Sequence, residues 1–272
     1  MKINNATYFG SDGRSALIDL ELPNNYNGNI ILFLHGFMGF KDWGAWHLVQ
    51  DYFVGHGFGF CKFNTSHNGG TVENGVDFPD PEAFGMNTYS KEIFDVKSVL
   101  EWLDKQLDEF TVHIIGHSKG GAVSLLCGFQ FDAIKSVSTW ASIASIGERF
   151  PEGDSMTLWK RQGVRYIKNG RTLQQLPQQI DLYEDYKQNQ DAYDIESICK
   201  KYSKPIFIAH GANDTSVSMD NGVRLAEWTG TKLQVIPEAD HVFESKHPWN
   251  SDCLPSALLH LCSLTADFIY DI

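Results

Sequence analysis

The 272-residue sequence predicts an α/β fold, with a mostly parallel central sheet flanked by helices. Three observations support this class. Short apolar runs alternate with helical patterns, which is typical of parallel strands joined by right-handed crossovers. One apolar run, Val112–Ile115, leads directly into the motif Gly116–Gly120 (Gly-His-Ser-Lys-Gly), and small residues follow it. The alternation stops between about residues 141 and 201 and then resumes, which indicates an insertion.

The elements expected before the interruption follow a regular order. Strands are expected at residues 15–22, 29–34, 58–63, 112–117 and 134–140, and helices at about 43–56, 89–110 and 119–131. A first hairpin strand is expected near residues 7–10. Residues 29–34 are apolar at every position after the first, as in a strand buried on both faces. The polar, glycine-rich loop over residues 64–87 is long enough to suggest a functional role.

The pattern resumes with strands at residues 205–210 and 232–236 and helices at about 219–229 and 255–270. The segment 141–201 is rich in Gln, Asp, Tyr and Arg and lacks a clear strand. We therefore expect a core domain formed by residues 1–140 and 202–272, and a small, mainly helical cap formed by residues 141–201.

Composition and charge narrow the function classes. The net charge of −12 argues against a nucleic-acid or anionic-membrane partner. No apolar stretch has the length of a membrane span, and the first residues lack the apolar region of a signal peptide, so we expect a cytoplasmic protein. The five cysteines are odd in number and lack metal-type spacing, which indicates free thiols. We expect no metal and no cofactor.

The motif Gly116–Gly120 is typical of a nucleophile elbow, a sharp strand-to-helix turn that presents a nucleophile above a parallel sheet. Ser118 is the expected nucleophile. Gly116 and Gly120 suit this turn because a Cβ at either position would collide with the neighbouring strand or helix. The alternative is an ordinary turn with a capping serine.

A serine hydroxyl needs a base and a third group that orients the base, and in the elbow architecture the acid precedes the histidine in the chain. Asp214 lies just after the strand at 205–210, and His241 lies just after the strand at 232–236. The interval from Ser118 to Asp214 leaves room for the insertion, and the next interval fits one helix and one strand. We therefore expect Ser118, Asp214 and His241 to form a catalytic triad.

Other residues compete for two of these roles. Asp240, beside His241, and Asp220, on the following helix, are alternative acids, although solvated or helix-capping carboxylates are common at such positions. His67 in the long loop is an alternative base. His117 and His210 have ordinary explanations as packing or turn histidines.

Acyl transfer also needs hydrogen-bond donors aimed at the oxyanion. The backbone N–H groups of Phe37 and Lys119 are the expected donors, since His35-Gly36-Phe37 follows a buried strand and Lys119 begins the helix after the elbow. The lysine side chain is expected to point away from the reacting carbonyl. A plain strand-to-helix turn is the alternative for the first of these segments.

Together these motifs resemble the α/β-hydrolase superfamily, over roughly residues 15–270. Within it, the chain is similar to small bacterial esterases of the dienelactone hydrolase and cinnamoyl (feruloyl) esterase type. The resemblance implies the α/β-hydrolase fold, and it assigns the nucleophile, acid, base and oxyanion roles to the residues named above. Dienelactone hydrolases proper carry a cysteine where this chain has Ser118, which separates it from them. Dehalogenases carry an aspartate there.

The expected function is therefore a cofactor-independent serine hydrolase that cleaves small-molecule carboxylic esters through an acyl-enzyme. Aromatic residues of the cap, chiefly Trp159, Tyr166 and Tyr183, are candidates for substrate binding. A thioesterase, acyltransferase or serine peptidase would use the same triad. A non-catalytic ligand-binding scaffold is the alternative from another class.

Overall fold

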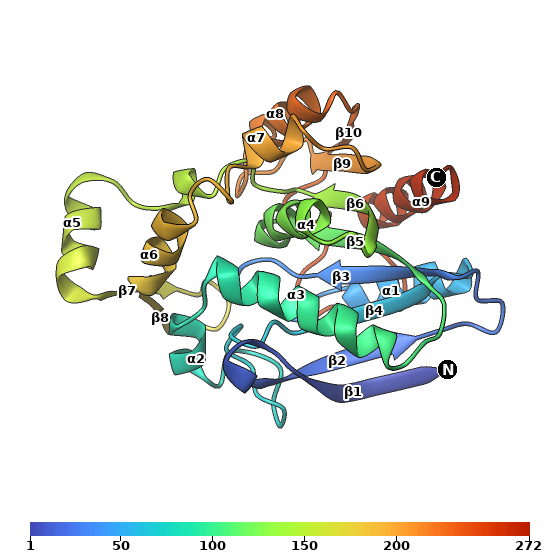
Figure 1. The fold of residues 1–272 in the computed structure, drawn as a ribbon, viewed down its shortest axis with the longest axis horizontal. Helices are drawn as coiled ribbons and strands as arrows, with labels where there is room; N and C mark the ends of the chain where they lie inside the picture. The colour runs from blue at the N-terminus through green and yellow to red at the C-terminus, as the bar shows by residue number, and fades with distance from the viewer.

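An eight-stranded sheet lies between helices on both of its faces (Figure 1). The computed structural model describes residues 1–272, and the strand order is β1-β2-β4-β3-β5-β6-β9-β10. The strands are β1 (Lys2–Phe9), β2 (Ser15–Glu21), β3 (Asn29–Leu34), β4 (Gly59–Phe63), β5 (Thr111–His117), β6 (Ile134–Trp140), β9 (Ile206–Gly211) and β10 (Leu233–Ile236). The six strands from β4 to β10 are parallel, whereas β1 and β2 pair antiparallel at one edge. The predicted fold class is confirmed.

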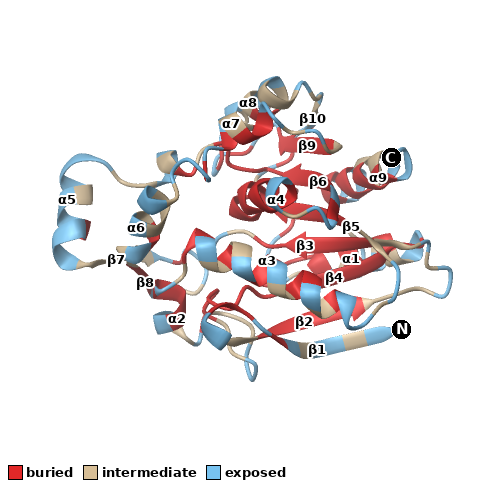
Figure 2. Ribbon diagram, viewed as in Figure 1, coloured by how far each residue is buried: buried red, intermediate tan, exposed pale blue.

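Strand β3 shows why the sheet needs helices on both faces. Its residues Ile30, Leu32 and Leu34 point into one hydrophobic core, and Ile31 and Phe33 point into the other. Because alternate side chains of a strand lie on opposite faces, an uninterrupted apolar run is stable only when both faces are covered. Figure 2 shows the central strands buried along their length.

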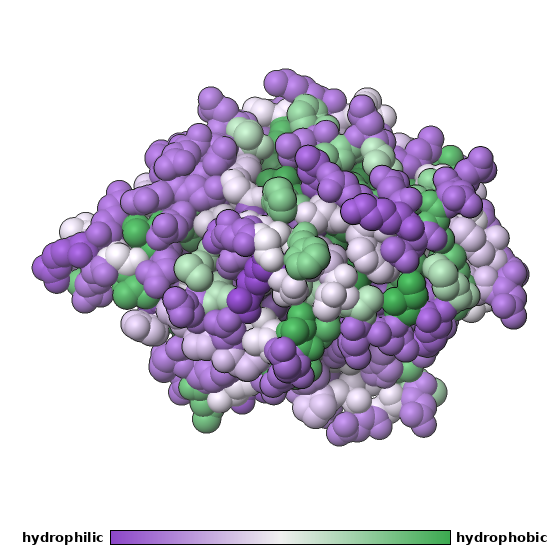
Figure 3. All heavy atoms as spheres, turned by 60° about the horizontal axis from the view of Figure 1, so that its bottom comes forward, coloured by the Kyte–Doolittle hydropathy of each residue, from purple (hydrophilic) through white to green (hydrophobic).

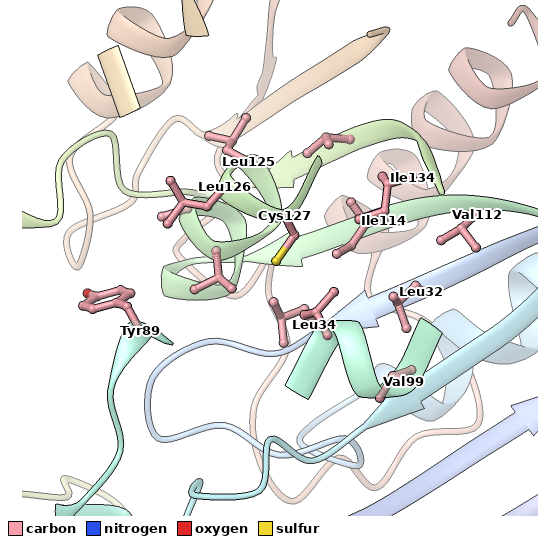
Figure 4. Packing of buried hydrophobic residues seen from close by; sticks show 14 of the residues in the cluster. Leu32, Leu34, Tyr89, Val99, Val112, Ile114, Leu125, Leu126, Cys127 and Ile134 are labelled. Atoms are coloured by element: carbon pink, nitrogen blue, oxygen red, sulfur yellow. The ribbon is translucent and has the colours of Figure 1, made fainter. Parts of the chain in front are cut away.

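The helices divide between the two faces. Helices α1 (Trp46–Gly55) and α9 (Ser256–Tyr270) cover one face, and α3 (Tyr89–Asp104), α4 (Lys119–Gln130) and α8 (Asp220–Thr229) cover the other. Figure 4 shows apolar side chains of β3, β5, α3 and α4 packed together on the second face, where Leu34 and Val99 lie near Cys127. The outer surface is different: on the face drawn in Figure 3, hydrophilic side chains predominate and hydrophobic ones form small separate patches.

The segment between β6 and β9 contains helices and an additional hairpin. Its elements are α5 (Gly153–Gln162), β7 (Val164–Lys168), β8 (Gln175–Gln179), α6 (Asp181–Gln188) and α7 (Ile195–Cys199), with a short 3-10 turn at Gly147–Arg149. Strands β7 and β8 form a separate antiparallel sheet, which the sequence analysis did not predict. In Figure 1, the elements from α5 to α6 lie beyond the end of the sheet toward which β3 points. The division into a core domain and a cap stays a prediction.

Two boundaries and one loop also differ from expectation. Strand β1 begins at Lys2 and is longer than the expected hairpin strand, and α3 ends at Asp104 rather than near residue 110. The long loop over residues 64–87 contains the short helix α2 (Pro81–Gly85), and its first residues, 64–69, are buried despite their polarity. No helix in the structure has both the length and the apolar character that crossing a membrane requires.

Candidate active site

Ser118 occupies the sharp turn between β5 and α4. Its backbone has φ 57° and ψ −122°, a region that non-glycine residues rarely adopt. The turn is held by the Ser118 N–H, which donates to the Trp140 carbonyl at 2.9 Å. A Cβ on Gly120 would lie 2.5 Å from the Leu34 carbonyl oxygen, and one on Gly36 would lie 2.9 Å from the Ser118 Cβ. These glycines allow the chain to pack closely around the serine.

A continuous hydrogen-bonded chain joins Ser118, His241 and Asp214. His241 Nε2 lies 2.9 Å from Ser118 Oγ, and His241 Nδ1 lies 2.7 Å from Asp214 Oδ2. The carboxylate oxygen accepts the Nδ1–H, and in this tautomer of the neutral imidazole Nε2 accepts the hydrogen of the serine hydroxyl. The three residues meet because each follows the carboxyl end of a parallel strand, and those ends share one edge of the sheet.

Asp214 is held in a fixed, ionised state. Its side chain is fully buried, and Oδ1 accepts the backbone N–H groups of Ser216 and Val217 at 2.9 Å each. Burial opposes the charged form, but hydrogen bonds from His210, His241 and the Val217 N–H outweigh burial and hold the pKa of Asp214 well below its usual range. Asp214 can therefore orient and stabilise a charged imidazole without itself taking a proton.

The alternative acids and base lie elsewhere. Asp240 Oδ1 accepts the backbone N–H groups of Val242 and Glu244, so it stabilises the turn after β10. Asp220 is the first residue of α8. His67 is buried beside Ser66 Oγ, 2.9 Å away. None of the three makes a hydrogen bond to Ser118 or His241.

Two further histidines support the triad, although their positions alone suggested packing or turns. His210 Nε2 lies 2.9 Å from the Val217 carbonyl and 3.2 Å from Asp214 Oδ2, and since both are acceptors Nε2 carries the hydrogen. His117 Nε2 lies 2.8 Å from the His241 carbonyl and donates to it. Burial lowers the pKa of His117 to about 3, so this ring stays neutral. The sequence did contain a signal for His210, because this histidine lies at the end of a predicted strand, directly before the loop that carries Asp214.

The loop after β3 lies against Ser118, since a Cβ on Gly36 would be 2.9 Å from the Ser118 Cβ. His35 braces this loop: its Nδ1–H donates to the Gly36 carbonyl at 3.0 Å, and its Nε2 accepts the Thr65 N–H at 3.3 Å. The following N–H, from Phe37, meets no protein acceptor. Lys119 is the first residue of α4, so its N–H has no acceptor within the helix. Both expected oxyanion donors are thus unoccupied by other backbone groups.

A cavity of about 290 Å³ opens at Ser118. Its other lining residues come from the β3 loop, the starts of α3 and α4, and the segment between β6 and β9: Phe37, Tyr89, Lys119, Ile143, Arg149, Phe150, Arg165, Ile167, Gln178 and Leu182. The volume is at the lower end of the range for small-molecule sites. Its lining combines aliphatic and aromatic side chains with a small number of polar ones, which is typical of small-molecule binding sites.

The three aromatics expected to bind substrate do not line this cavity. Trp159 is 1% exposed, and its Nε1–H donates to the Gln178 carbonyl inside the segment. Tyr166 is 63% exposed, because alternation along β7 turns it away from the cavity while its neighbours Arg165 and Ile167 face inward. Tyr183 packs edge-on against Phe150.

The side chain of Lys119 forms a buried ion pair that the sequence analysis missed. Its Nζ lies 2.9 Å from Glu92 Oε1, on α3, and 4.7 Å from the centre of the Tyr89 ring. Both members of the pair are nearly inaccessible, with side-chain exposures of 9% and 8%. The ammonium group is therefore neutralised at the cavity wall.

Replacing Lys119 with glutamine should affect stability far more than chemistry. Loss of one partner leaves Glu92 buried and unpaired, at a cost of about 3–5 kcal/mol in the free energy of unfolding. The backbone N–H remains, so kcat on a small neutral ester should fall less than about tenfold. Urea unfolding and steady-state kinetics separate the two effects. Adding Glu92→Gln should restore part of the stability, and a hundredfold loss of kcat in folded Lys119→Gln would show that the ammonium takes part in the reaction.

The depressed pKa of Asp214 has a measurable effect on stability. Because this carboxylate binds protons less readily in the folded than in the unfolded state, it stabilises the fold above about pH 4 and loses that contribution as the pH falls. The difference in unfolding free energy between the wild type and Asp214→Asn should be constant above about pH 5 and shrink as the pH falls toward about 3, as measured by urea titration. A difference that does not vary with pH would contradict the assigned ionisation.

No cluster of three or more His, Cys, Asp and Glu side chains is arranged to hold a metal ion. All five cysteines are free; Cys253 is exposed and the other four are buried.

Comparison with known proteins connects this site to a family. Residues 82–229, more than half of the chain, match the model of the BD-FAE family. The match includes Ser118 and Asp214, whereas Phe37 and His241 lie outside it. A search of curated proteins found no match.

Solved structures share the fold over nearly the full chain at low sequence identity. Est1E from Butyrivibrio proteoclasticus with bound ferulic acid is 19% identical, covers 98% of both chains and has a TM-score of 0.71. A putative hydrolase from Agrobacterium vitis S4 is 17% identical over 99% of this chain and 98% of its own, with a TM-score of 0.74. Dienelactone hydrolase from Anabaena variabilis ATCC 29413 is 15% identical over 100% and 97%, with a TM-score of 0.65. The chain belongs to the BD-FAE family and has the α/β-hydrolase fold, as its resemblance to these esterases and hydrolases predicted.

Proposed function

We propose that this protein is a serine carboxylesterase in which Ser118, His241 and Asp214 act as the catalytic triad. The observation that carries the proposal is the unbroken hydrogen-bonded chain from Ser118 Oγ through the imidazole to the buried carboxylate. Family membership and the shared fold of known esterases support the same reaction class.

In the first half of the reaction, Ser118 Oγ attacks the ester carbonyl and its proton passes to His241 Nε2. The negative charge that develops on the carbonyl oxygen is stabilised by the N–H groups of Phe37 and Lys119, with help from the positive end of α4. His241 then returns the proton to the departing alcohol, leaving an acyl group on Ser118. Asp214 stabilises the imidazolium and keeps its ring oriented throughout.

In the second half, a water molecule takes the place of the alcohol. His241 Nε2 accepts its proton as the water oxygen attacks the acyl carbonyl, and the same N–H groups stabilise the second tetrahedral intermediate. Collapse of that intermediate breaks the bond to Ser118 Oγ, which regains its proton from the imidazolium. The products are one carboxylic acid and one alcohol, and no cofactor is consumed.

The segment over residues 141–201 is proposed to act as a cap that selects the substrate. Seven of the residues around the cavity belong to it: Ile143, Arg149, Phe150, Arg165, Ile167, Gln178 and Leu182. The triad lies outside it. Changes in this segment are therefore expected to alter substrate preference more than the chemical step.

Competition between water and an alcohol tests the acyl-enzyme. Esters that share one acyl group but differ in leaving alcohol are hydrolysed in the presence of methanol, and the ratio of methyl ester to free acid is measured. A common acyl-enzyme predicts the same ratio for every leaving group, because partitioning occurs after the alcohol has departed. A ratio that follows the leaving group would exclude this intermediate, and absence of hydrolysis across a panel of acyl lengths and hydroxycinnamate esters would overturn the esterase assignment.

A further inference from the structure

The cavity at Ser118 carries positive charge in a protein that is strongly negative overall. The chain has 34 acidic and 22 basic residues, yet three cationic side chains and no carboxylate line this cavity. The cations are Lys119, Arg149 and Arg165. Of these, Lys119 is neutralised by its buried partner Glu92. Two arginines therefore determine the charge that a substrate meets.

Arg149 has no acidic partner, and the acid beside it in the chain is paired with another arginine. Glu148 accepts hydrogen bonds from both terminal nitrogens of Arg224, each at 2.9 Å. Arg149 forms no ion pair in the structure and is exposed at the cavity. Its guanidinium is free to bind an anion.

Arg165 is held in a fixed orientation and also lacks an acidic partner. Its Nε–H donates to Gln178 Oε1 at 2.7 Å, and its guanidinium lies 4.1 Å from the centre of the buried Trp159 ring. Burial lowers the pKa of Arg165, and no carboxylate offsets that cost with an ion pair. The remaining N–H groups form a pre-positioned fork, the geometry that binds a carboxylate through two parallel hydrogen bonds.

A second cavity shows that this charge is specific to the site. It has a volume of about 320 Å³, lies between the β6–α5 connection and helices α7 and α8, and lacks Ser118. Four carboxylates line it, Glu148, Asp191, Asp194 and Glu196, with Arg224 as the single cation. Carboxylates line that cavity, whereas cationic side chains line the cavity at Ser118. The positive charge at Ser118 therefore does not reflect a generally basic cap.

We propose that the substrate is an ester that carries a negatively charged carboxylate away from the scissile bond, and that Arg149 and Arg165 bind this carboxylate. The proposal rests on the esterase function proposed above and specifies its substrate class. The arginines would hold the anion at the cap while the ester carbonyl lies against Ser118. A neutral ester of the same shape would leave both guanidinium groups without a partner, so it would bind less well.

The test compares two substrates that differ only in charge. Monoethyl esters of linear dicarboxylic acids, from succinic to suberic acid, are paired with the same esters in which a carboxamide replaces the free carboxylate. For the best chain length, kcat/KM of the wild type should favour the carboxylate at least about tenfold, and the preference should weaken as salt is added. Arg149→Gln and Arg165→Gln should each reduce the ratio several-fold, and the double variant should bring it near one.

Arg161→Gln serves as the matched control, since Arg161 is an exposed cation of the same segment that does not line the cavity. It should leave the ratio at the wild-type value. Arg165→Glu should reverse the preference, so that the carboxamide is the better substrate. Hydrolysis of both esters by the wild type with a ratio near one would overturn the charge selection while leaving the esterase assignment intact. Hydrolysis of neither ester, nor of any neutral ester in the panel above, would overturn the esterase assignment itself.

Discussion

Ser118→Ala is expected to lower kcat on any ester substrate by about 10⁵-fold or more, while the protein remains folded. Alanine removes the only atom that would bond to the acyl group, so the residual rate comes from the oxyanion donors and from binding alone. The buried surroundings of the turn do not depend on the hydroxyl, which makes one hydrogen bond, to His241. The unfolding free energy should therefore change by only about 1 kcal/mol.

A neighbouring serine provides the control for this substitution. Ser124 lies on α4, the helix that begins directly after Ser118, and its Oγ is buried without a hydrogen-bond partner. Ser124→Ala removes the same hydroxyl oxygen from the helix that follows Ser118 and should retain kcat within about threefold. If purified Ser118→Ala turned over an ester at a near-normal rate, the nucleophile would be a different group.

Asp214→Asn is expected to lower kcat on the order of 10⁴-fold, judging from the equivalent change in serine proteases. The asparagine oxygen can still accept the N–H groups of Ser216 and Val217, which places its NH₂ group toward His241. That NH₂ needs an acceptor at Nδ1, so the imidazole proton moves to Nε2. A protonated Nε2 cannot accept the proton of Ser118, and the nucleophile stays inactive.

Asp240→Asn is the matched comparison, because Asp240 is adjacent to His241 and carries the same functional group. Its carboxylate accepts the Val242 and Glu244 N–H groups, and an asparagine oxygen can accept both. Steady-state kinetics should show less than about a tenfold loss of kcat. A mild effect at Asp214 combined with a severe one at Asp240 would mean that the acid is Asp240.

The arrangement of the candidate triad could be predicted from sequence because it depends on a regular feature of the fold. In a parallel sheet, residues just after the strands share one edge, so Ser118, Asp214 and His241 had to lie near one another once β5, β9 and β10 were identified. The same reasoning located the N–H groups of Phe37 and Lys119. Apolar runs specify such buried strands strongly.

The hairpin of β7 and β8 was missed because its sequence lacks that signal. Strand β8 contains three glutamines and a proline, and β7 (Val-Arg-Tyr-Ile-Lys) has only five residues, in which polar and apolar side chains do not alternate. The hairpin packs through few buried positions, chiefly Leu176 and Gln178, so little of its pattern is constrained by burial. Had β7 been identified, alternation would have separated Arg165 from Tyr166.

Contacts between distant segments explain the remaining omissions. Glu92 lies 27 positions before Lys119, and their pairing depends on how α3 packs against α4. Arg149 has no ion-pair partner, and the glutamate beside it in the chain is bound by Arg224 on α8. Local patterns in a sequence do not record such partners, and the overall charge of −12 pointed away from a positive cavity.

Reaction with a fluorophosphonate, followed by peptide mass spectrometry, identifies the nucleophilic residue. The reagent forms a stable phosphonyl bond to an activated serine, displacing fluoride, and mimics the tetrahedral intermediate at the oxyanion donors. If Ser118 is the nucleophile, each molecule should take up one label, located on Ser118. Esterase activity should be lost in proportion to labelling, and Ser118→Ala should not be labelled. Loss of activity with Ser118 unmodified, or a stoichiometric label on another residue, would contradict this assignment.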